Sequence, residues 1–131
     1  MKKKYVLNNI SSLNLDIKRP CIIFLKGDLG AGKTTLSKYI LNDLLGIKKE
    51  ITSPTYTYYN KYDENYHFDL YRLDNYDEFF AIGGEEILDN NSGVILIEWP
   101  EIIEDYYKPD IEIKLNKTEN EDEREVEIIY K

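Results

Sequence analysis

The sequence predicts an α/β fold of three layers, with helices on both faces of a mostly parallel central sheet and with antiparallel additions. Two runs of consecutive apolar residues, 21–25 and 94–97, are typical of strands that are buried on both faces, as in a parallel sheet. Near the end of the chain, residues 111–116 and 125–130 alternate apolar and polar side chains, which predicts an antiparallel pair with one face toward solvent. The 131 residues are expected to form a single domain, residues 1–131.

The chain before the first apolar run is expected to hold one short strand and one brief helix. Residues 4–7 are compatible with the strand. Asn8 or Asn9 could cap a helix that continues to Ile17, because apolar residues recur along it at helical spacing. Pro20 lies directly before the first apolar run, where the N–H group that proline lacks is not needed.

The first apolar run leads into the stretch GDLGAGKT at residues 27–34, which matches the P-loop pattern G-x-x-x-x-G-K-[ST]. Its glycines let the backbone turn tightly, so that successive N–H groups and the N-terminus of the following helix form a cradle for phosphate. In this pattern Lys33 reaches the β- and γ-phosphates, and the Thr34 hydroxyl binds Mg²⁺. A helix is expected from about Thr34 to Leu45, with Gly46 as its stop. The strand, loop and helix together predict a P-loop NTPase-like domain.

The middle of the chain is expected to contain a hairpin and two short helices. Pro54 argues against a regular central strand within residues 51–59. A polar turn at 61–65 separates this stretch from the extended residues 66–70, which favours a hairpin. A helical pattern follows at 74–89, and two glycines break it into two short helices.

Two carboxylates are candidate site residues, because ligands gather at the carboxyl ends of the strands in α/β sheets. Glu98 ends the second apolar run, where a P-loop NTPase usually has an acid that binds Mg²⁺ or its water; the alternative is an acid that points into solvent. Asp69 could hold a metal-bound water or orient the attacking water; the alternative is a carboxylate paired with Arg72 or His67. His67 is interpreted as structural, since no carboxylate lies at a spacing that would mark it as a general base.

Two further stretches resemble nucleotide-sensing elements. Thr55, within TSPTY at residues 52–56, could sense the γ-phosphate, although a capped turn at a rigid proline fits the same residues. Residues 60–63 spell N-K-x-D, the guanine-reading pattern of GTPases, but they follow the P-loop too closely for a base-reading loop. We interpret N-K-x-D here as a polar hairpin turn.

Charge and composition restrict the partners and the compartment. A net charge of −8 argues against a chain that grips RNA or DNA by itself. No stretch approaches the roughly 20 apolar residues of a membrane span, and no apolar segment of a signal peptide follows the basic residues 1–4. We therefore expect a cytoplasmic protein without membrane association. The single cysteine, Cys21, excludes an intrachain disulfide and is expected to be a small buried hydrophobe.

Four blocks stand in order along the chain: GDLGAGKTT at 27–35, TSPTYTYY at 52–59, HFDLYRL at 67–73 and IEWPE at 97–101. Together they resemble the TsaE (YjeE) family of bacterial P-loop ATPases. The resemblance implies a compact α/β domain that assists formation of N6-threonylcarbamoyladenosine on the tRNA adenosine next to the anticodon. It also implies that the partners TsaD and TsaB carry out the transfer and that tRNA is reached only through that complex. The role implied for this chain is ATP hydrolysis, weak alone and stimulated by the partners.

The resemblance also implies roles for individual residues. It implies an ATP phosphate cradle formed by Gly27, Asp28, Leu29, Gly30, Ala31, Gly32, Lys33, Thr34 and Thr35. Thr34 and Glu98 are the implied Mg²⁺ ligands. The implied catalytic residues are Lys33, Asp69 and Glu98, and residues 53–56 would form the nucleotide-sensing segment.

The two ends of the chain depart from typical members of the family. The segment before the first core strand is short, so the adenine contacts are not marked by a motif. Residues 7–10, with Asn9 as the binding candidate, are expected to lie near the base. Arg124 resembles a basic residue often found in the C-terminal hairpin and is expected to approach the nucleotide.

Two other functions are compatible with the sequence. A small-molecule kinase also uses a P-loop, but it needs an acceptor pocket and usually a lid that carries arginines. The three arginines, at positions 19, 72 and 124, are far apart in the chain. A nucleotide-gated binding module with negligible hydrolysis fits as well, because no residue is clearly a strong general base.

Overall fold

The structure is a computed structural model that describes residues 2–28, 30–54 and 57–131. Three predicted site residues, Leu29 of the phosphate cradle and Thr55 and Tyr56 of the sensing segment, lie outside the described residues. In chain order the elements are β1 (Lys2–Val6), η1 (Leu7–Ser12), β2 (Cys21–Gly27), α1 (Lys33–Lys38), η2 (Tyr39–Leu44), β3 (Tyr59–Tyr62), β4 (Asn65–Asp69), α2 (Tyr76–Ala81), α3 (Gly84–Asp89), β5 (Val94–Glu98), η3 (Pro100–Ile103), β6 (Ile111–Lys117) and β7 (Glu123–Tyr130).

One sheet of seven strands, in the order β1-β7-β6-β2-β5-β4-β3, runs through the structure. Its four central strands, β6, β2, β5 and β4, are parallel to one another. The outer strands pair antiparallel, β7 with β6 and β1 with β7 on one side, and β3 with β4 on the other. This arrangement confirms the predicted α/β fold with a mostly parallel core and antiparallel additions.

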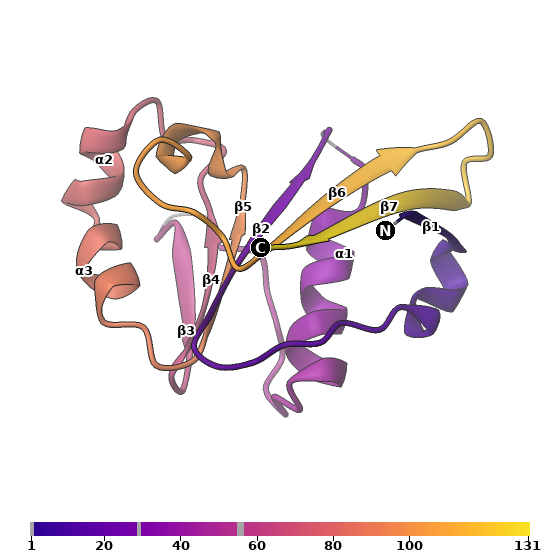
Figure 1. Ribbon diagram of the computed structural model, residues 1–131, viewed down its shortest axis with the longest axis horizontal. Helices are drawn as coiled ribbons and strands as arrows, with labels where there is room; N and C mark the ends of the chain where they lie inside the picture. Colours follow the sequence, from indigo (N-terminus) through magenta and orange to yellow (C-terminus); the bar gives the residue numbers. More distant parts are fainter. Residues whose placement is uncertain (1, 29, 55–56) are drawn as a thin grey trace.

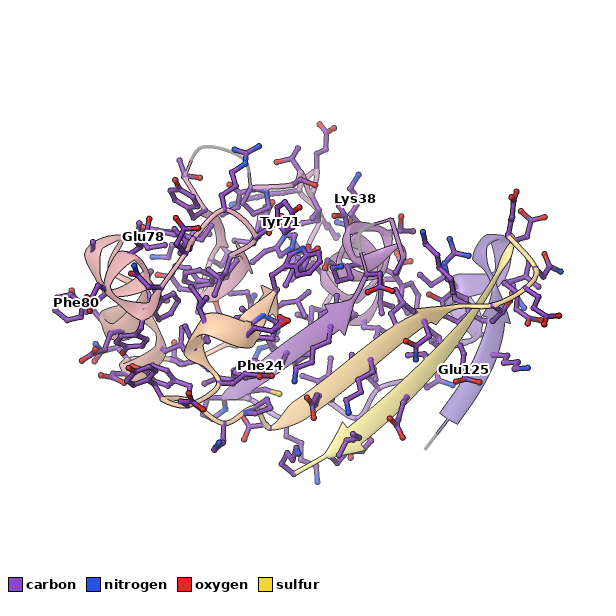
Figure 2. All side chains as sticks on the ribbon, turned by 90° about the horizontal axis from the view of Figure 1, so that it is seen from above. Phe24, Lys38, Tyr71, Glu78, Phe80 and Glu125 are labelled. Atoms are coloured by element: carbon purple, nitrogen blue, oxygen red, sulfur yellow. The ribbon has the colours of Figure 1, made fainter. Side chains whose placement is uncertain are left out.

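Helices cover both faces of the sheet, and alternate residues of the central strands supply the two cores. In β5, Leu96 packs with α1 and η2, whereas Ile95 and Ile97 pack with α2, α3 and η3. Figure 1 shows the pair α2–α3 separated from α1, with strands β4, β5 and β2 between them. In α2, Phe79 is fully buried, and Phe80 and Glu78 point away from the sheet (Figure 2).

The predicted hairpins and short helices are present. The turn between β3 and β4 lies at Asp63 and Glu64, and Asp63 has a left-handed backbone with φ of 58°. The N-K-x-D residues therefore belong to this hairpin, as predicted. Cys21 is buried, also as predicted. Among the residues that the structure describes, no helix is both long enough and apolar enough to cross a membrane.

The N-terminal segment differs from the prediction. The helix is a 3-10 helix that ends at Ser12 instead of continuing to Ile17, and its N-cap is Val6, with no side-chain cap. Leu13 is extended, with φ of −80° and ψ of 132°, and is buried in the core beside α1. Apolar residues at 13, 15 and 17 pack there from an extended chain. The prediction was wrong because this period-two pattern shares residues with a helical one.

The helix after the P-loop also differs in its second half, which the structure gives as π-helix. Asn42, within η2, donates from its side-chain amide to the carbonyls of Ile47 and Lys49, at 2.8 and 2.9 Å. These bonds bring the following turn, with Gly46 at φ of 73°, back against the helix. The helix ends at Leu44 and Gly46 follows it, so the predicted stop is confirmed.

Candidate active site

The P-loop connects the central strand β2 to α1 and lies at the carboxyl end of the parallel strands. Gly30 and Gly32 adopt left-handed backbones, with φ of 79° and 100°. Gly27 lies so close to β6 that a Cβ atom on it would come within 2.6 Å of the Leu115 carbonyl oxygen. Glycine at these three positions is therefore required by backbone conformation or by close approach, as a phosphate-binding loop needs.

Lys33 is buried beneath the loop and is surrounded by acceptors and an aromatic ring. Its ammonium group donates to the carbonyls of Gly27 and Asp28, the latter at 3.0 Å. Its Nζ also lies 3.8 Å from the centroid of the Trp99 ring. Burial lowers the pKa of Lys33, and nearby carboxylates, Glu98 foremost, oppose that shift.

Trp99 reaches this position because the chain turns sharply at the end of β5. Its backbone is left-handed, with φ of 58° and ψ of 57°, and Pro100 follows as the first residue of η3. The ring also contacts that of Tyr71, with centroids 4.8 Å apart. Tyr71 is exposed. The two rings form the aromatic part of the site.

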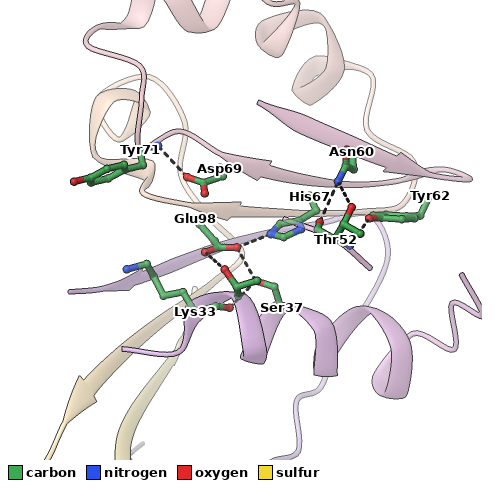
Figure 3. A network of polar contacts seen from close by, with 10 residues as sticks. Lys33, Ser37, Thr52, Asn60, Tyr62, His67, Asp69, Tyr71 and Glu98 are labelled. Carbon is green, nitrogen blue, oxygen red and sulfur yellow. Dashed lines mark hydrogen bonds and ion pairs between the residues drawn. The ribbon is translucent and has the colours of Figure 1, made fainter. Parts of the chain in front are cut away.

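Glu98, the last residue of β5, is buried and points at α1. Its Oε1 lies 3.5 Å from the Thr34 hydroxyl. Its Oε2 accepts from the Ser37 hydroxyl at 3.2 Å and lies 2.5 Å from His67 Nε2 (Figure 3). Only 2% of Glu98 is exposed, so the alternative of a carboxylate that points into solvent does not hold. The predicted magnesium ligands Thr34 and Glu98 are thus brought together.

Asp69, the last residue of β4, lies directly opposite Glu98 in the parallel register. Its Oδ1 accepts from the Tyr71 backbone N–H at 3.0 Å. Burial raises the pKa of Asp69, the Tyr71 hydrogen bond opposes this increase, and the charge of Glu98 adds to it. The sheet therefore presents two carboxylates side by side at the ends of β4 and β5.

These groups line one cavity of about 280 Å³. Its lining residues are Gly30, Gly32, Lys33, Thr34, Thr35, Asp69, Tyr71, Glu98 and Trp99. A second cavity of about 210 Å³ shares Asp69 and Tyr71 and adds Ser53, Pro54 and Arg72. The start of the predicted sensing segment, at Ser53, therefore shares a cavity with Asp69.

Among the described residues predicted to contact the nucleotide, Gly27, Asp28 and Ala31 of the cradle do not line the P-loop cavity, and neither do Asn9 and Arg124. Asn9 is exposed within η1. Arg124 is buried and supports the P-loop from β7, with its Nε donating to the Ala31 carbonyl at 2.8 Å. One terminal nitrogen of Arg124 donates to the carbonyls of Glu121 and Glu123, at 2.7 and 2.9 Å. Arg124 thus holds the backbone of the loop at Ala31, and its approach to the nucleotide stays a prediction.

Several site residues escaped the sequence-based prediction. His67, interpreted from the sequence as structural, has a carboxylate partner in Glu98, which lies 31 positions away in the chain and was not foreseen. Ser37, one turn after Thr34 on α1, contacts the same carboxylate. Lys117 ends β6 beside the loop, with its Nζ 3.4 Å from the point where a Cβ on Gly30 would lie. The helical spacing of Ser37 and the position of Lys117 at a strand end were the available signals.

The chain is similar to proteins of one family along most of its length. The sequence profile of the family described as "Threonylcarbamoyl adenosine biosynthesis protein TsaE" matches residues 3–126. The chain is 37% identical to "tRNA threonylcarbamoyladenosine biosynthesis protein TsaE" of Rickettsia prowazekii, over 90% of this chain and 84% of that protein. The protein of the same name from Haemophilus influenzae is 36% identical over 89% and 75% of the two chains.

Other relatives match over a smaller share of their length. The protein of the same name from Rickettsia conorii is 41% identical over 76% of this chain, and the match spans 58% of the relative. Among solved structures, "Crystal structure of Bacillus subtilus YdiB" superposes with a TM-score of 0.64 and 30% identity. That superposition covers 96% of this chain and 82% of the other.

Proposed function

This chain belongs to the TsaE family, and from that premise we propose that it binds and hydrolyses Mg²⁺-ATP in support of tRNA threonylcarbamoyladenosine formation. The observation that carries the proposal is the meeting of Glu98, at the end of β5, with the Thr34 hydroxyl at the start of α1. A P-loop followed by a strand-end acid at its hydroxyl is the arrangement with which P-loop NTPases hold Mg²⁺ at the β- and γ-phosphates.

The donor set at this point suits a magnesium ion. Thr34 offers a hydroxyl oxygen and Glu98 a carboxylate oxygen, and Mg²⁺ prefers oxygen ligands. The described residues contain no group of three or more histidine, cysteine, aspartate or glutamate side chains that could hold a metal by themselves. Such a sparse site is usual for Mg²⁺, which keeps waters and substrate phosphates among its ligands. When bound, Mg²⁺ neutralises charge on the phosphates.

The remaining groups have roles that follow from their positions. The N–H groups of the glycine-rich loop and of the first turn of α1 bind phosphate oxygens, and Lys33 adds a positive charge beside them. Asp69 lies next to Glu98 at the same edge of the sheet, where its ionised form would accept a hydrogen bond from the attacking water and orient it. Each role concerns binding or orientation, in keeping with slow hydrolysis by the chain alone.

The proposed partners are TsaD and TsaB, with tRNA reached through their complex in the cytoplasm. The net charge of −8 supports this division of labour, because an acidic chain is repelled by the tRNA backbone. A subunit of this charge can serve a tRNA-modifying assembly if other subunits hold the RNA.

The test is ATP hydrolysis by the chain alone and with TsaB and TsaD, compared among the unaltered chain, Lys33→Ala and Lys38→Ala. Lys38 is the matched control, because it lies on the same helix, is exposed and does not line the cavity. We expect hydrolysis that the partners stimulate, that Lys33→Ala abolishes and that Lys38→Ala preserves. Equal rates in all samples would refute the ATPase proposal. A preference for GTP, or phosphate transfer to a metabolite, would support a GTPase or a kinase instead.

A further inference from the structure

Glu98 has two oxygens in different surroundings. Its Oε2 lies 2.5 Å from His67 Nε2. The Ser37 hydroxyl lies 3.2 Å from the same oxygen, but it shares its single hydrogen with the Lys33 carbonyl at 2.8 Å, so His67 is the main anchor of Oε2. The other oxygen, Oε1, has one long contact, 3.5 Å to the Thr34 hydroxyl. Glu98 and Thr34 line the cavity, whereas His67 and Ser37 do not. Oε2 is therefore anchored on the protein side, and Oε1 is the oxygen beside the P-loop hydroxyl.

His67 is as deeply buried as the carboxylate that it contacts. It is fully buried in β4, directly opposite Leu96, which is also fully buried in β5. With Glu98 as a carboxylate, which only accepts hydrogen bonds, the contact of 2.5 Å places a hydrogen on Nε2 that points at Glu98. The other ring nitrogen, Nδ1, has no hydrogen-bond partner among the described residues. Among the described residues, Glu98 is thus the one hydrogen-bond partner of this ring.

We propose that His67 is a positioning residue, which anchors Oε2 of Glu98 so that Oε1 is presented to the metal ion beside Thr34. The inference rests on the proposed function. Without the anchor, a glutamate side chain has several staggered rotamers, and only some of them place Oε1 beside the hydroxyl. Groups that orient a metal ligand from behind typically change metal affinity or activity by about 10- to 100-fold when they are removed. His67 acts through Glu98 and contacts neither the metal nor the nucleotide.

The first test is independent of hydrolysis. Because the chain contains one histidine, its imidazole gives a single set of nitrogen signals in NMR spectra of labelled protein. We expect the hydrogen of His67 on Nε2 and in slow exchange with water, since the ring is buried, and we expect Glu98→Gln to shift this signal. A hydrogen on Nδ1 alone, or a signal that Glu98→Gln leaves unchanged, would overturn the proposal.

The second test compares His67→Gln, whose amide keeps a donor near the position of Nε2, with His67→Leu, which removes it. Nucleotide affinity is followed through the fluorescence of Trp99, the only tryptophan, which lines the cavity. Without Mg²⁺, both variants should bind ATP as the unaltered chain does. With Mg²⁺, His67→Leu should lose about 10- to 100-fold in affinity, and His67→Gln should keep most of it.

The outcomes of the second test separate the positioning role from simple packing. A folded His67→Leu variant with normal magnesium dependence would overturn the proposal. A His67→Gln variant as impaired as His67→Leu would also overturn it, because the shape of the ring and not its donor would then matter. If His67→Leu does not fold, the NMR measurement decides alone. If the unaltered chain binds no ATP, the proposed function itself fails.

Discussion

Gly27→Ala is expected to displace the P-loop, because the last residue of β2 has no room for a side chain. A Cβ atom at Gly27 would lie 2.6 Å from the carbonyl oxygen of Leu115, where ordinary contact begins near 3.4 Å. Gly27 and Leu115 are register partners in the parallel pair β2–β6. Because β6 is bonded to β2 on one side and β7 on the other, its carbonyl has little freedom to retreat. The strain therefore falls on the start of the loop.

The distance from this Cβ atom to the Leu115 oxygen is about 0.8 Å shorter than ordinary contact, and this overlap sets the expected losses of stability and activity. Overpacking of this kind typically lowers the free energy of unfolding by about 1–3 kcal/mol. A displacement near 1 Å at catalytic groups can cost about 100-fold in rate. We therefore expect Gly27→Ala to unfold at lower denaturant concentration and to lose about 100-fold in ATP hydrolysis. Denaturation followed by fluorescence gives the first quantity, and phosphate release gives the second.

Gly83→Ala provides the control. Gly83 has a left-handed backbone with φ of 85°, and nothing lies within 4 Å of a Cβ atom there. Alanine in this conformation costs roughly 1–2 kcal/mol, so stability should fall comparably while hydrolysis is retained. If Gly27→Ala hydrolyses ATP as the unaltered chain does, or if Gly83→Ala loses hydrolysis equally, the loop is not displaced as argued.

Three further predictions concern single side chains. Glu98→Gln keeps the size of the side chain while removing its charge. We therefore expect the free energy of unfolding to change by about 1 kcal/mol or less, and the magnesium-dependent ATPase rate to fall roughly 100-fold. Normal magnesium dependence of this variant would contradict the assignment of Glu98 as a ligand. Burial raises the pKa of Asp69 above its ordinary 3.8, so its carboxyl keeps the proton to higher pH, and hydrolysis that needs the ionised form should be lost as pH falls through that raised pKa. A pH–rate profile tests this, and an acid limb that persists unchanged in Asp69→Asn would assign the titration to another group. Burial raises the pKa of the Cys21 thiol to about 11, and the charge of Asp110 adds to the increase, so almost no thiolate exists at neutral pH. Alkylation should therefore require denaturation, and rapid labelling of the folded chain would show that Cys21 is accessible.

The P-loop and the β3–β4 hairpin were predictable because their determinants are local. The strand before the loop and the helix after it adjoin the glycine motif in the sequence, and the hairpin is joined by a short polar turn. The N-terminal helix was overextended for a local reason as well. Ile10, Leu13 and Ile17 fit a helical repeat, and Leu13, Leu15 and Ile17 fit an extended chain. The two periods are distinguished by the packing of Leu15, which belongs only to the extended pattern, and by the extended backbone of Leu13.

The contact between His67 and Glu98 was not predictable from spacing, because the two residues are 31 positions apart and belong to different strands. Their meeting requires that β4 be the neighbour of β5 and that the pair be parallel. The same holds for Lys33 and Trp99, which come together through the left-handed turn after β5. In both pairs the partners are far apart in the sequence, so no local motif predicts either contact.

The register of β4 against β5 explains the order of polar and apolar residues in the motif His67-Phe68-Asp69. His67 and Asp69 are two residues apart in β4, so both side chains lie on the face that meets α1, as does that of Glu98 in β5. A slip of one residue would turn both side chains of β4 to the other face, toward α2 and α3, and would leave Glu98 buried with fewer donors. Phe68, between them, opposes such a slip because it is fully buried in the core on that other face. The apolar residue of the HFD motif therefore fixes the register in which its two polar neighbours reach Glu98.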